Sequence, residues 1–406
     1  MDALTAGMNT LVQETHMLTG LSVTFGTDKE AETRLTGNAC EVRYEGGTCF
    51  PDVRPLTPDS IYDLASLTKC FTAILAMQLI EEGKLQKDAS VASYAPWFTH
   101  LDTLSVFDLL TFQTGLESPG RIDEAPTPEE GMRRLYETKA CPPPTIRLYS
   151  DMHALIAARV LEAVLDAPYM DILKSRILSP LGMSETGPTA DPARVLSYAY
   201  EHRLISGTHS MRQGPMPGII HDPKAQLLQP VCLTCCGHAG LFSTQRDMLR
   251  FAQGLLSGEL LPLSTLSAMG ENRTGYQYPD GTYRQFLGVL CFSKHPQQRL
   301  SELPEWMGNH TIGLSGFTGN HLAVDPDSKT FILYLGNRVH NRLTRVTPSS
   351  AEAYSVLGLN PDGTGQIELP DLPAPIFSSA SYVYFKDRCL GNPIGEIMRS
   401  YEWLRQ

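Results

Sequence analysis

The chain has 406 residues, with 33 lysines and arginines against 44 aspartates and glutamates, and a formal net charge of −11 at pH 7. This acidic balance argues against nucleic acid as a partner, and no run approaches the ~20 apolar residues that a membrane-spanning helix needs. A chain of this length is expected to bury a large core in one large or two intermixed domains. The residues after Met1 have neither the basic nor the apolar region of a signal peptide, which predicts a cytoplasmic protein.

The first part of the chain is expected to form one helix, several strands and a second helix. Residues 1–19 have the apolar spacing of an amphipathic helix. Residues 21–25 and 39–44 are typical of strands bounded by glycine-rich turns. A strand-like segment, 60–64, then leads into an apolar helix that ends near Gly83, a residue suited to a helix C-cap.

The middle of the chain, from about residue 88 to residue 235, is mostly helical or loop-like in pattern. The predicted helices are 106–112, 151–165, 169–178 and, further on, 247–256. The predicted strands that follow are 286–292, 321–325 and 330–335. Strands at both ends with helices between them predict an α+β fold, in which helices flank one antiparallel sheet built from both ends of the chain.

These patterns predict a division of the chain into three parts. Residues 1–87 and 236–345 would form an α/β domain, and residues 88–235 a mainly helical inserted domain. Residues 346–406 would be a C-terminal extension, to which the sequence assigns no role. Within it, 361–375 is predicted to be a loop, 381–385 a strand, and 392–405 a helix with Pro393 at its start.

Ser66 and Lys69 form a Ser-x-x-Lys motif at the start of the apolar helix after residue 64. Residues three apart share one face of a helix. A lysine that projects into an apolar core is costly unless it is paired or neutral. A nucleophilic serine that needs a nearby base would justify this cost. The motif therefore predicts Ser66 as a nucleophile and Lys69 as its partner.

Tyr149 stands directly before the predicted helix at 151–165, with Asp151 two residues later. The dipole at a helix N-terminus favours a phenolate, and a nearby cationic lysine would further lower a pKa that is ordinarily ~10. Tyr149 could thus transfer a proton. The alternative, a tyrosine packed beneath the start of the helix, stays open on local sequence alone.

Two glycine-rich stretches accompany these residues. Gly313 to Gly319 precedes a predicted strand, and its backbone N–H groups could face a substrate carbonyl or oxyanion; a simple tight turn is the alternative. Gly237 to Thr244 is a glycine-flanked loop that enters a helix.

The nine cysteines are scattered, which fits a reducing compartment better than a disulfide framework. Cys232, Cys235 and Cys236, with His238 close behind, invite a zinc interpretation. A structural zinc site usually needs a second ligand pair at a suitable spacing, and none follows soon. Packed thiols are the better interpretation, and the sequence predicts neither a metal nor another cofactor.

In this order, the motifs resemble those of the penicillin-recognising serine hydrolases, and most closely the class C β-lactamase-like group with its esterases and D-stereospecific peptidases. Ser66-x-x-Lys69 is similar to the first motif of that family, and Tyr149-Ser-Asp151 to its Tyr-x-Asn motif. The stretches that look like those of non-lactamase members are 221–225, 237–244 and 336–340. The resemblance spans roughly residues 1–345 and implies a β-lactamase/transpeptidase-like fold.

The resemblance also implies a mechanism. Ser66 would attack a small ester, amide or peptide and form an acyl-enzyme, while Lys69 and Tyr149 move the proton from Ser66 to the leaving group. The N–H groups of Ser66 and Phe317 would form the oxyanion hole. Water would then release the acid.

The third motif departs from the family pattern, which is Lys-Thr-Gly or His-Thr-Gly. Here it is Leu314-Ser315-Gly316, and leucine can neither donate a hydrogen bond nor carry charge. His310, four residues upstream, could reach in, although a turn histidine is the commoner role. Arg338 is another substitute cation, with a surface arginine as the alternative.

Asp151 replaces the asparagine of the second motif. As an anion it would repel a substrate carboxylate and favour a positive Lys69. Both departures argue against efficient β-lactamase or carboxypeptidase activity. The leading hypothesis is therefore a serine hydrolase of small esters or amides. The alternatives are a D-amino-acid or peptidoglycan-type peptidase or β-lactamase, and a catalytically impaired member that acts as a binding module.

Overall fold

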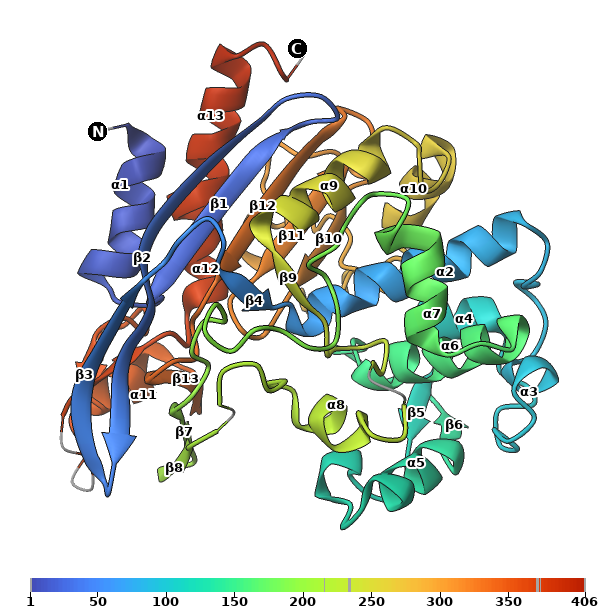
Figure 1. Cartoon of the computed structure of the whole chain (residues 1–406), viewed down its shortest axis with the longest axis horizontal. Coiled ribbons are helices and arrows are strands. Elements are labelled where there is room, and N and C mark those ends of the chain that lie inside the picture. The colour runs from blue at the N-terminus through green and yellow to red at the C-terminus, as the bar shows by residue number, and fades with distance from the viewer. Residues whose placement is uncertain (1, 215, 233–234, 370–371, 373, 405–406) are drawn as a thin grey trace.

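The computed structural model describes residues 2–214, 216–232, 235–369, 372 and 374–404. Its centre is a six-stranded sheet in the order β10-β11-β12-β1-β2-β3, in which every neighbouring pair is antiparallel (Figure 1). The strands are β1 (Gly20–Thr27), β2 (Ala31–Glu45), β3 (Thr48–Pro55), β10 (Ile312–Ser315), β11 (His321–Asp325) and β12 (Thr330–Gly336). Since β1 pairs with β12, the two ends of the chain build one sheet, as predicted.

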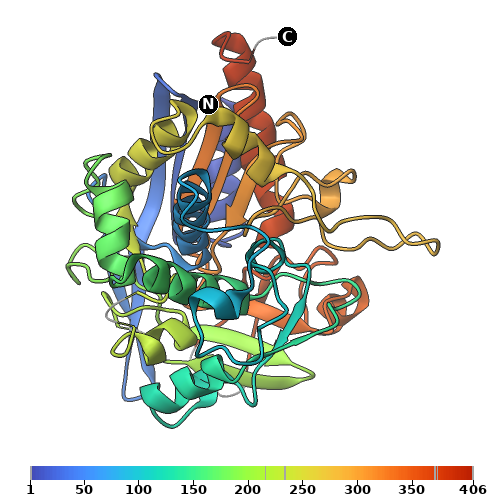
Figure 2. The same ribbon diagram turned by 90° about the vertical axis from the view of Figure 1, so that its right-hand side faces the viewer.

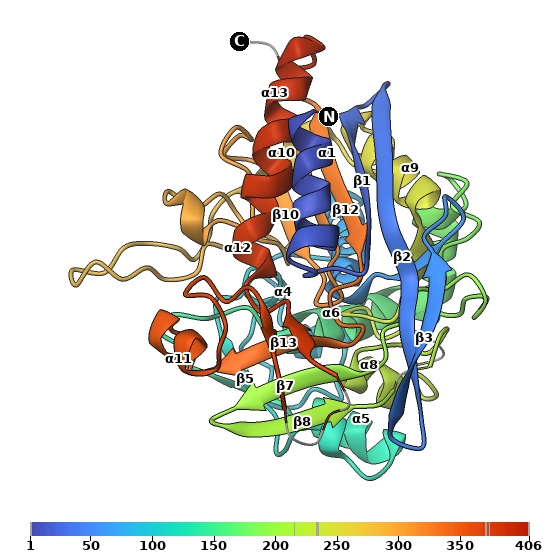
Figure 3. The same ribbon diagram turned by 90° about the vertical axis from the view of Figure 1, so that its left-hand side faces the viewer.

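Helices cover both faces of this sheet. On one face lie α2 (Thr68–Glu81), α9 (Gln245–Leu256) and α10 (Leu263–Gly270). On the other lie α1 (Ala3–Asn9), α12 (Tyr382–Lys386) and α13 (Asn392–Ser400), with α1 beside α13 (Figure 3). Helix α2 is buried on nearly all sides, as expected for a helix whose sequence is apolar all round. The α2 helix therefore provides a rigid base for the residues at its N-terminus.

The helical region beside the sheet is built around α6 (Asp151–Leu165), which packs against α2. The other helices of this region are α3 (Val91–Tyr94), α4 (Val106–Leu110), α5 (Pro128–Tyr136), α7 (Tyr169–Leu173) with its continuation η4 (Lys174–Leu178), and α8 (Pro223–Leu228). The predicted helix at 151–165 is confirmed, and those at 106–112, 169–178 and 247–256 correspond to α4, α7 with η4, and α9.

A second, five-stranded sheet joins the middle of the chain to its C-terminal part, in the order β14-β15-β13-β7-β8. Its strands are β7 (Glu201–Ile205), β8 (Thr208–Arg212), β13 (Arg342–Thr347), β14 (Gln366–Ile367) and β15 (Ile376–Ser378). Two short pairs complete the sheets: β4 (Ile61–Asp63) with β9 (Phe242–Thr244), and β5 (Gly115–Glu117) with β6 (Lys139–Cys141). The segment 88–235 thus contributes strands as well as helices, and the three-part division remains a prediction.

Two predicted strands are wrong. Residues 286–292 form a buried turn, in which Leu290 has φ +50° and its N–H bonds to the carbonyl of Leu110. The apolar run reflects burial, which periodicity alone cannot distinguish from a strand. Residues 381–385 fall in α12, where Tyr382 and Phe385 are buried three residues apart, a helical spacing.

The end of the chain partly matches its predicted pattern. The final predicted helix corresponds to α13, with proline in its first turn, and its predicted end at residue 405 lies outside the described residues. The predicted loop at 361–375 contains the short strand β14. Among the described residues, no helix is both long and apolar enough to cross a membrane.

Candidate active site

Ser66 lies in a single 3₁₀ turn, η2 (Ala65–Leu67), between β4 and α2. Ala65 adopts φ +47°, an uncommon conformation for a residue with a side chain, and the buried Asp63 carboxylate accepts a hydrogen bond from its N–H at 2.9 Å. The same carboxylate accepts one from the N–H of His221 at 2.7 Å. Asp63 therefore fixes the sharp turn that presents the Ser66 side chain.

Lys69 is fully buried one turn later, and its ammonium is surrounded by acceptors. Its Nζ lies 2.8 Å from Ser66 Oγ, 2.9 Å from Asp151 Oδ1 and 3.1 Å from the carbonyl oxygen of His238. Although burial opposes a charge, the Asp151 carboxylate holds the pKa of Lys69 above its ordinary value. Lys69 in this arrangement is a hydrogen-bond donor to Ser66 and carries a positive charge.

Tyr149 is held between two aromatic rings beside Lys69. Its ring stacks on Phe292, with centroids 5.0 Å apart, and on Phe112 at 5.7 Å. Lys69 Nζ lies 5.1 Å from the Tyr149 ring centroid. Burial raises the pKa of Tyr149, and the positive charge of Lys69 opposes that shift. The Tyr149 hydroxyl is buried without a hydrogen-bond partner among the described residues.

Asp151 stands in the first turn of α6 between two lysines. Its Oδ1 pairs with Lys69, and its Oδ2 lies 2.8 Å from Nζ of Lys224, on α8. Despite burial, the charges of Lys69, His238 and Lys224 hold the pKa of Asp151 well below its ordinary value. The predicted preference of Asp151 for a positive Lys69 thus has a direct structural basis in this ion pair.

The sequence did not predict that Lys224, Asp222 and His238 would join this network. His238 Nε2 lies 3.0 Å from Asp222 Oδ1, and the acid and imidazole ligand atoms of Asp151, Asp222 and His238 lie within 4.8 Å of one another. Such a group can hold a metal ion, but both oxygens of Asp151 already accept from ammonium groups. The family resemblance had pointed to the stretches 221–225 and 237–244, but their spacing in the sequence did not predict that they meet in the structure.

The cysteines near His238 are packed as small buried side chains. The thiol of Cys232 faces Met132 Sδ at 3.8 Å, and that of Cys236 faces the carbonyl of Ala225 at 3.8 Å. His238 directs its Nε2 to Asp222 instead. These contacts agree with the packed-thiol interpretation of the motif.

The turn after β10 is tied to the segment before Ser66. Thr318 Oγ1 and Asn320 Nδ2 both donate to the carbonyl oxygen of Asp63, at 2.9 and 2.7 Å. Gly316 approaches so closely that a Cβ there would lie 2.7 Å from the Leu64 carbonyl oxygen. Phe317, in this turn, has a backbone N–H without an acceptor among the described residues. The predicted oxyanion donor therefore lies on a loop that is anchored beside the nucleophile.

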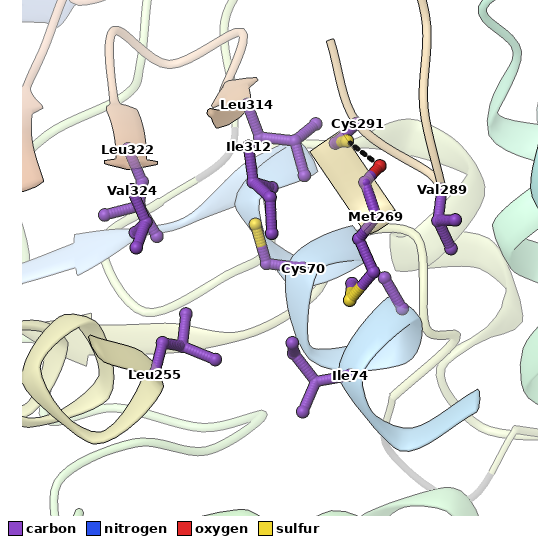
Figure 4. Close-up of a pocket in the computed structure, with 11 residues that line it drawn as sticks. Cys70, Ile74, Leu255, Met269, Val289, Cys291, Ile312, Leu314, Leu322 and Val324 are labelled. Carbon is purple, nitrogen blue, oxygen red and sulfur yellow. Dashed lines mark hydrogen bonds between the residues drawn. The ribbon is translucent and has the colours of Figure 1, made fainter. Parts of the chain in front are cut away.

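The side chains of the third motif point away from one another. Leu314 is fully buried and lines a small apolar cavity of about 10 Å³ with Cys70 and Ile74 of α2 (Figure 4). Ser315 faces the other way, and its Oγ donates to Glu302 Oε2 at 2.7 Å and lies 2.9 Å from His321 Nδ1. An apolar cluster therefore surrounds the position that the resemblance assigns to a basic residue.

One of the two predicted substitutes for that basic residue, His310, does not take its place. His310 lies beyond the opposite end of β10 from Ser315, where its Nδ1 pairs with Asp327 Oδ2 at 2.7 Å, so its inclusion in the site is wrong. The four residues of β10 separate it from the turn that carries Phe317. Arg338 is a buried residue that packs 5.1 Å from the Phe317 ring centroid and donates to the Thr344 carbonyl. It supports the Phe317 ring and is not a surface arginine.

A serine in contact with a buried lysine, a tyrosine at a helix start and a free N–H on the loop after β10 are groups that an acylating serine hydrolase needs. A family model described as beta-lactamase matches residues 36–354. The chain therefore belongs to the beta-lactamase family, a family of serine hydrolases.

The comparisons with individual proteins agree with this assignment. The chain is 24% identical over 363 residues to a Salmonella enteritidis PT4 protein named putative D-alanyl-D-alanine carboxypeptidase, and 79% of each chain is covered. EstCE1, described as a hydrolase with promiscuous acyltransferase activity, matches with a TM-score of 0.62 at 20% identity, covering 82% of this chain and 93% of that one. A class C beta-lactamase from Rhodobacter sphaeroides matches with a TM-score of 0.56 at 21% identity, covering 83% and 94%. These likenesses confirm the predicted β-lactamase/transpeptidase-like fold.

Proposed function

We propose that this protein cleaves a small ester or amide that lacks a carboxylate beside the scissile bond, through an acyl-enzyme on Ser66. The observation that carries the proposal is the contact of 2.8 Å between Lys69 Nζ and Ser66 Oγ, inside a cluster that also holds Tyr149. Relatives named as a hydrolase and as a putative carboxypeptidase support small-molecule or peptide substrates.

The charges of the cluster suggest how the proton moves. Because Lys69 is held as an ammonium, we assign the base role to the phenolate form of Tyr149. Burial raises the pKa of Tyr149, and the charge of Lys69 counteracts this shift. Ser66 Oγ attacks the carbonyl carbon as its proton passes to Tyr149, and the N–H groups of Ser66 and Phe317 stabilise the oxyanion. When the bond to the leaving group breaks, Tyr149 returns the proton to it, and water later hydrolyses the Ser66 ester.

The substrate preference follows from the third motif and from Asp151. Leu314 provides no positive charge, the Ser315 hydroxyl is already hydrogen-bonded to Glu302, and Asp151 adds an anion near Ser66. Each of these features disfavours the carboxylate that β-lactams and D-alanyl peptides carry. A peptidase of D-amino-acid or peptidoglycan type is the second candidate, favoured by the name of the Salmonella relative.

The proposal is tested by comparing substrate classes with the purified full chain. We expect 4-nitrophenyl acetate and butyrate to be hydrolysed with a kcat/KM at least about 10²-fold above that for a chromogenic cephalosporin or a D-alanyl-D-alanine peptide. The Ser66→Ala variant is the control and should lose the ester activity. A cephalosporin or D-alanyl peptide that reacts faster than the esters would contradict the proposal and favour the second candidate or a β-lactamase.

A further inference from the structure

A cavity of about 240 Å³ adjoins the catalytic tyrosine and is not used by the mechanism above. Phe292, one of its walls, is the ring that stacks on Tyr149. Gln285, another wall, accepts hydrogen bonds from the N–H groups of Leu148 and Tyr149, both at 3.0 Å. The loop around residues 276–284, which contributes Tyr283 and Arg284 to the cavity, extends outward as the gold segment at the right of Figure 2. In the proposed mechanism Tyr149 protonates the leaving group, and the Phe292 ring that stacks on Tyr149 is a wall of this cavity.

Glu302 places a carboxylate in this cavity beside the third motif. Its Oε2 accepts from Ser315 Oγ at 2.7 Å, and that hydroxyl also lies 2.9 Å from His321 Nδ1. Burial keeps His321 neutral by lowering its pKa far below the ordinary value. The Ser315 hydroxyl can therefore donate to Glu302 while accepting from His321. Glu302 Oε1 has no hydrogen-bond partner among the described residues and remains available to a ligand.

A second polar group in the cavity also lacks a partner. Ser293 lines the cavity and is only 2% exposed, and its Oγ makes no hydrogen bond within the described part of the chain. Buried polar groups are nearly always satisfied by protein, water or ligand. The rings of Tyr283 and Phe286 form the adjoining wall, and aromatic faces attract cations. These features together suit a group with hydrogen-bond donors and a positive charge.

We propose that this cavity is the leaving-group subsite and that it takes a substrate arm ending in a protonated amine, held by Glu302. The inference rests on the proposed function and adds the chemical class of the leaving group. A carboxylate that faces an ammonium forms a charge-assisted hydrogen bond, which is stronger than a neutral one.

Two arginines also line the cavity. They would favour the alternative interpretation, in which the cavity takes a substrate arm that ends in a carboxylate. Arg147 is exposed, so solvent and salt screen its charge. Arg284 packs 5.7 Å from the ring centroid of Tyr276, and its Nε has no partner among the described residues. Glu302 is favoured because it contacts Ser315 directly, next to the oxyanion loop, while Arg147 faces the solvent.

The C-terminal segment holds the loop that carries Glu302. Lys386 Nζ donates to the Glu302 carbonyl oxygen at 3.0 Å, and Trp306 Nε1 donates to the Gly391 carbonyl at 2.8 Å. Both Lys386 and Gly391 lie beyond residue 354, where the family match ends. The C-terminal extension, to which the sequence assigned no role, thus makes contacts that hold the loop carrying Glu302 and would position Glu302 itself.

The test uses three acetate esters that differ only in the arm on the leaving phenol: 3-aminomethyl, 3-ethyl and 3-carboxymethyl. For each ester, kcat/KM is measured for the wild type and for Glu302→Gln, so that the intrinsic reactivity of each phenol cancels in the ratio. We expect Glu302→Gln to lower the preference for the aminomethyl over the ethyl ester by about tenfold or more, as for one hydrogen bond to a charged group. Glu302→Asp should restore part of the preference.

The matched control is Glu305→Gln, which removes the same charge from an exposed position three residues along the same loop and should leave the preference unchanged. Equal preference in the wild type and Glu302→Gln, with the ethyl ester still hydrolysed, would overturn the amine subsite and leave the proposed function standing. A wild-type preference for the carboxymethyl ester would also overturn it, in favour of the arginines. No hydrolysis of any of the three esters would instead count against the proposed function itself.

Discussion

Replacing Lys69 by methionine is expected to lower kcat/KM for ester hydrolysis by about 10²–10⁴-fold. Methionine keeps the length of the side chain and removes the ammonium that contacts Ser66 and Asp151. Without this charge, the pKa of Tyr149, which burial already raises, rises further, and less of the phenolate base is present at neutral pH. The measurement is the initial rate on 4-nitrophenyl acetate, with folding checked by circular dichroism.

Lys224→Met is the matched control for this prediction. It removes the same charge from the other oxygen of Asp151, at 2.8 Å, without contact to Ser66. We expect it to change kcat/KM by less than about tenfold, because Lys69 keeps its own contacts. If both variants lost activity equally, the effect would belong to the charge cluster as a whole, and the specific role of Lys69 would be wrong.

Replacing Asp151 by asparagine is expected to move the rising limb of the pH profile of kcat/KM to lower pH. The direction follows from Tyr149, the base of the proposed mechanism. Burial raises the pKa of Tyr149, and the Asp151 carboxylate raises it further. Removing the Asp151 charge lets Tyr149 lose its proton at lower pH. Activity at neutral pH should therefore rise, about tenfold for each pH unit that the limb moves.

Lys224→Met is the control for this shift, because its expected shift is not toward lower pH. In Lys224→Met, Asp151 loses its second cationic partner and its full charge acts on Lys69. The rising limb should then stay in place or move to higher pH. A limb that moved to higher pH in Asp151→Asn, or did not move at all, would show that the Asp151 carboxylate does not raise the pKa of the base, Tyr149.

Local patterns in the sequence predicted the central elements and the core of the site. The apolar spacing of 151–165 defined α6. Ser66 and Lys69 were singled out because a serine and a lysine one turn apart at the start of an apolar helix favour nucleophilic catalysis. The local sequence left the role of Tyr149 open, and its catalytic assignment rested on the family resemblance. Where a signal was ambiguous, prediction failed. The apolar run at 286–292 was buried without being a strand, because burial and strand formation produce the same composition.

Contacts between distant segments could not be predicted in this way. Lys224 contacts Asp151 although the two residues are 73 positions apart in the sequence, and the local pattern around either residue does not predict this contact. The Glu302 loop is likewise fixed by Lys386, 84 positions later, through a backbone carbonyl. His310 was wrongly placed in the site because it is close to Leu314 in sequence. In the structure it lies beyond the other end of β10, where it pairs with Asp327.

The central claim is that Ser66 is an activated nucleophile, and the mass of the intact protein after treatment with a fluorophosphonate tests it most directly. Wild-type protein should gain the mass of one phosphonyl group, and peptide mapping should place it on Ser66, within the fixed turn between β4 and α2. The Ser66→Ala variant should gain none. A well-folded wild-type protein that remained unlabelled, or that was labelled equally in Ser66→Ala, would contradict the account and favour a binding module that retains the family fold.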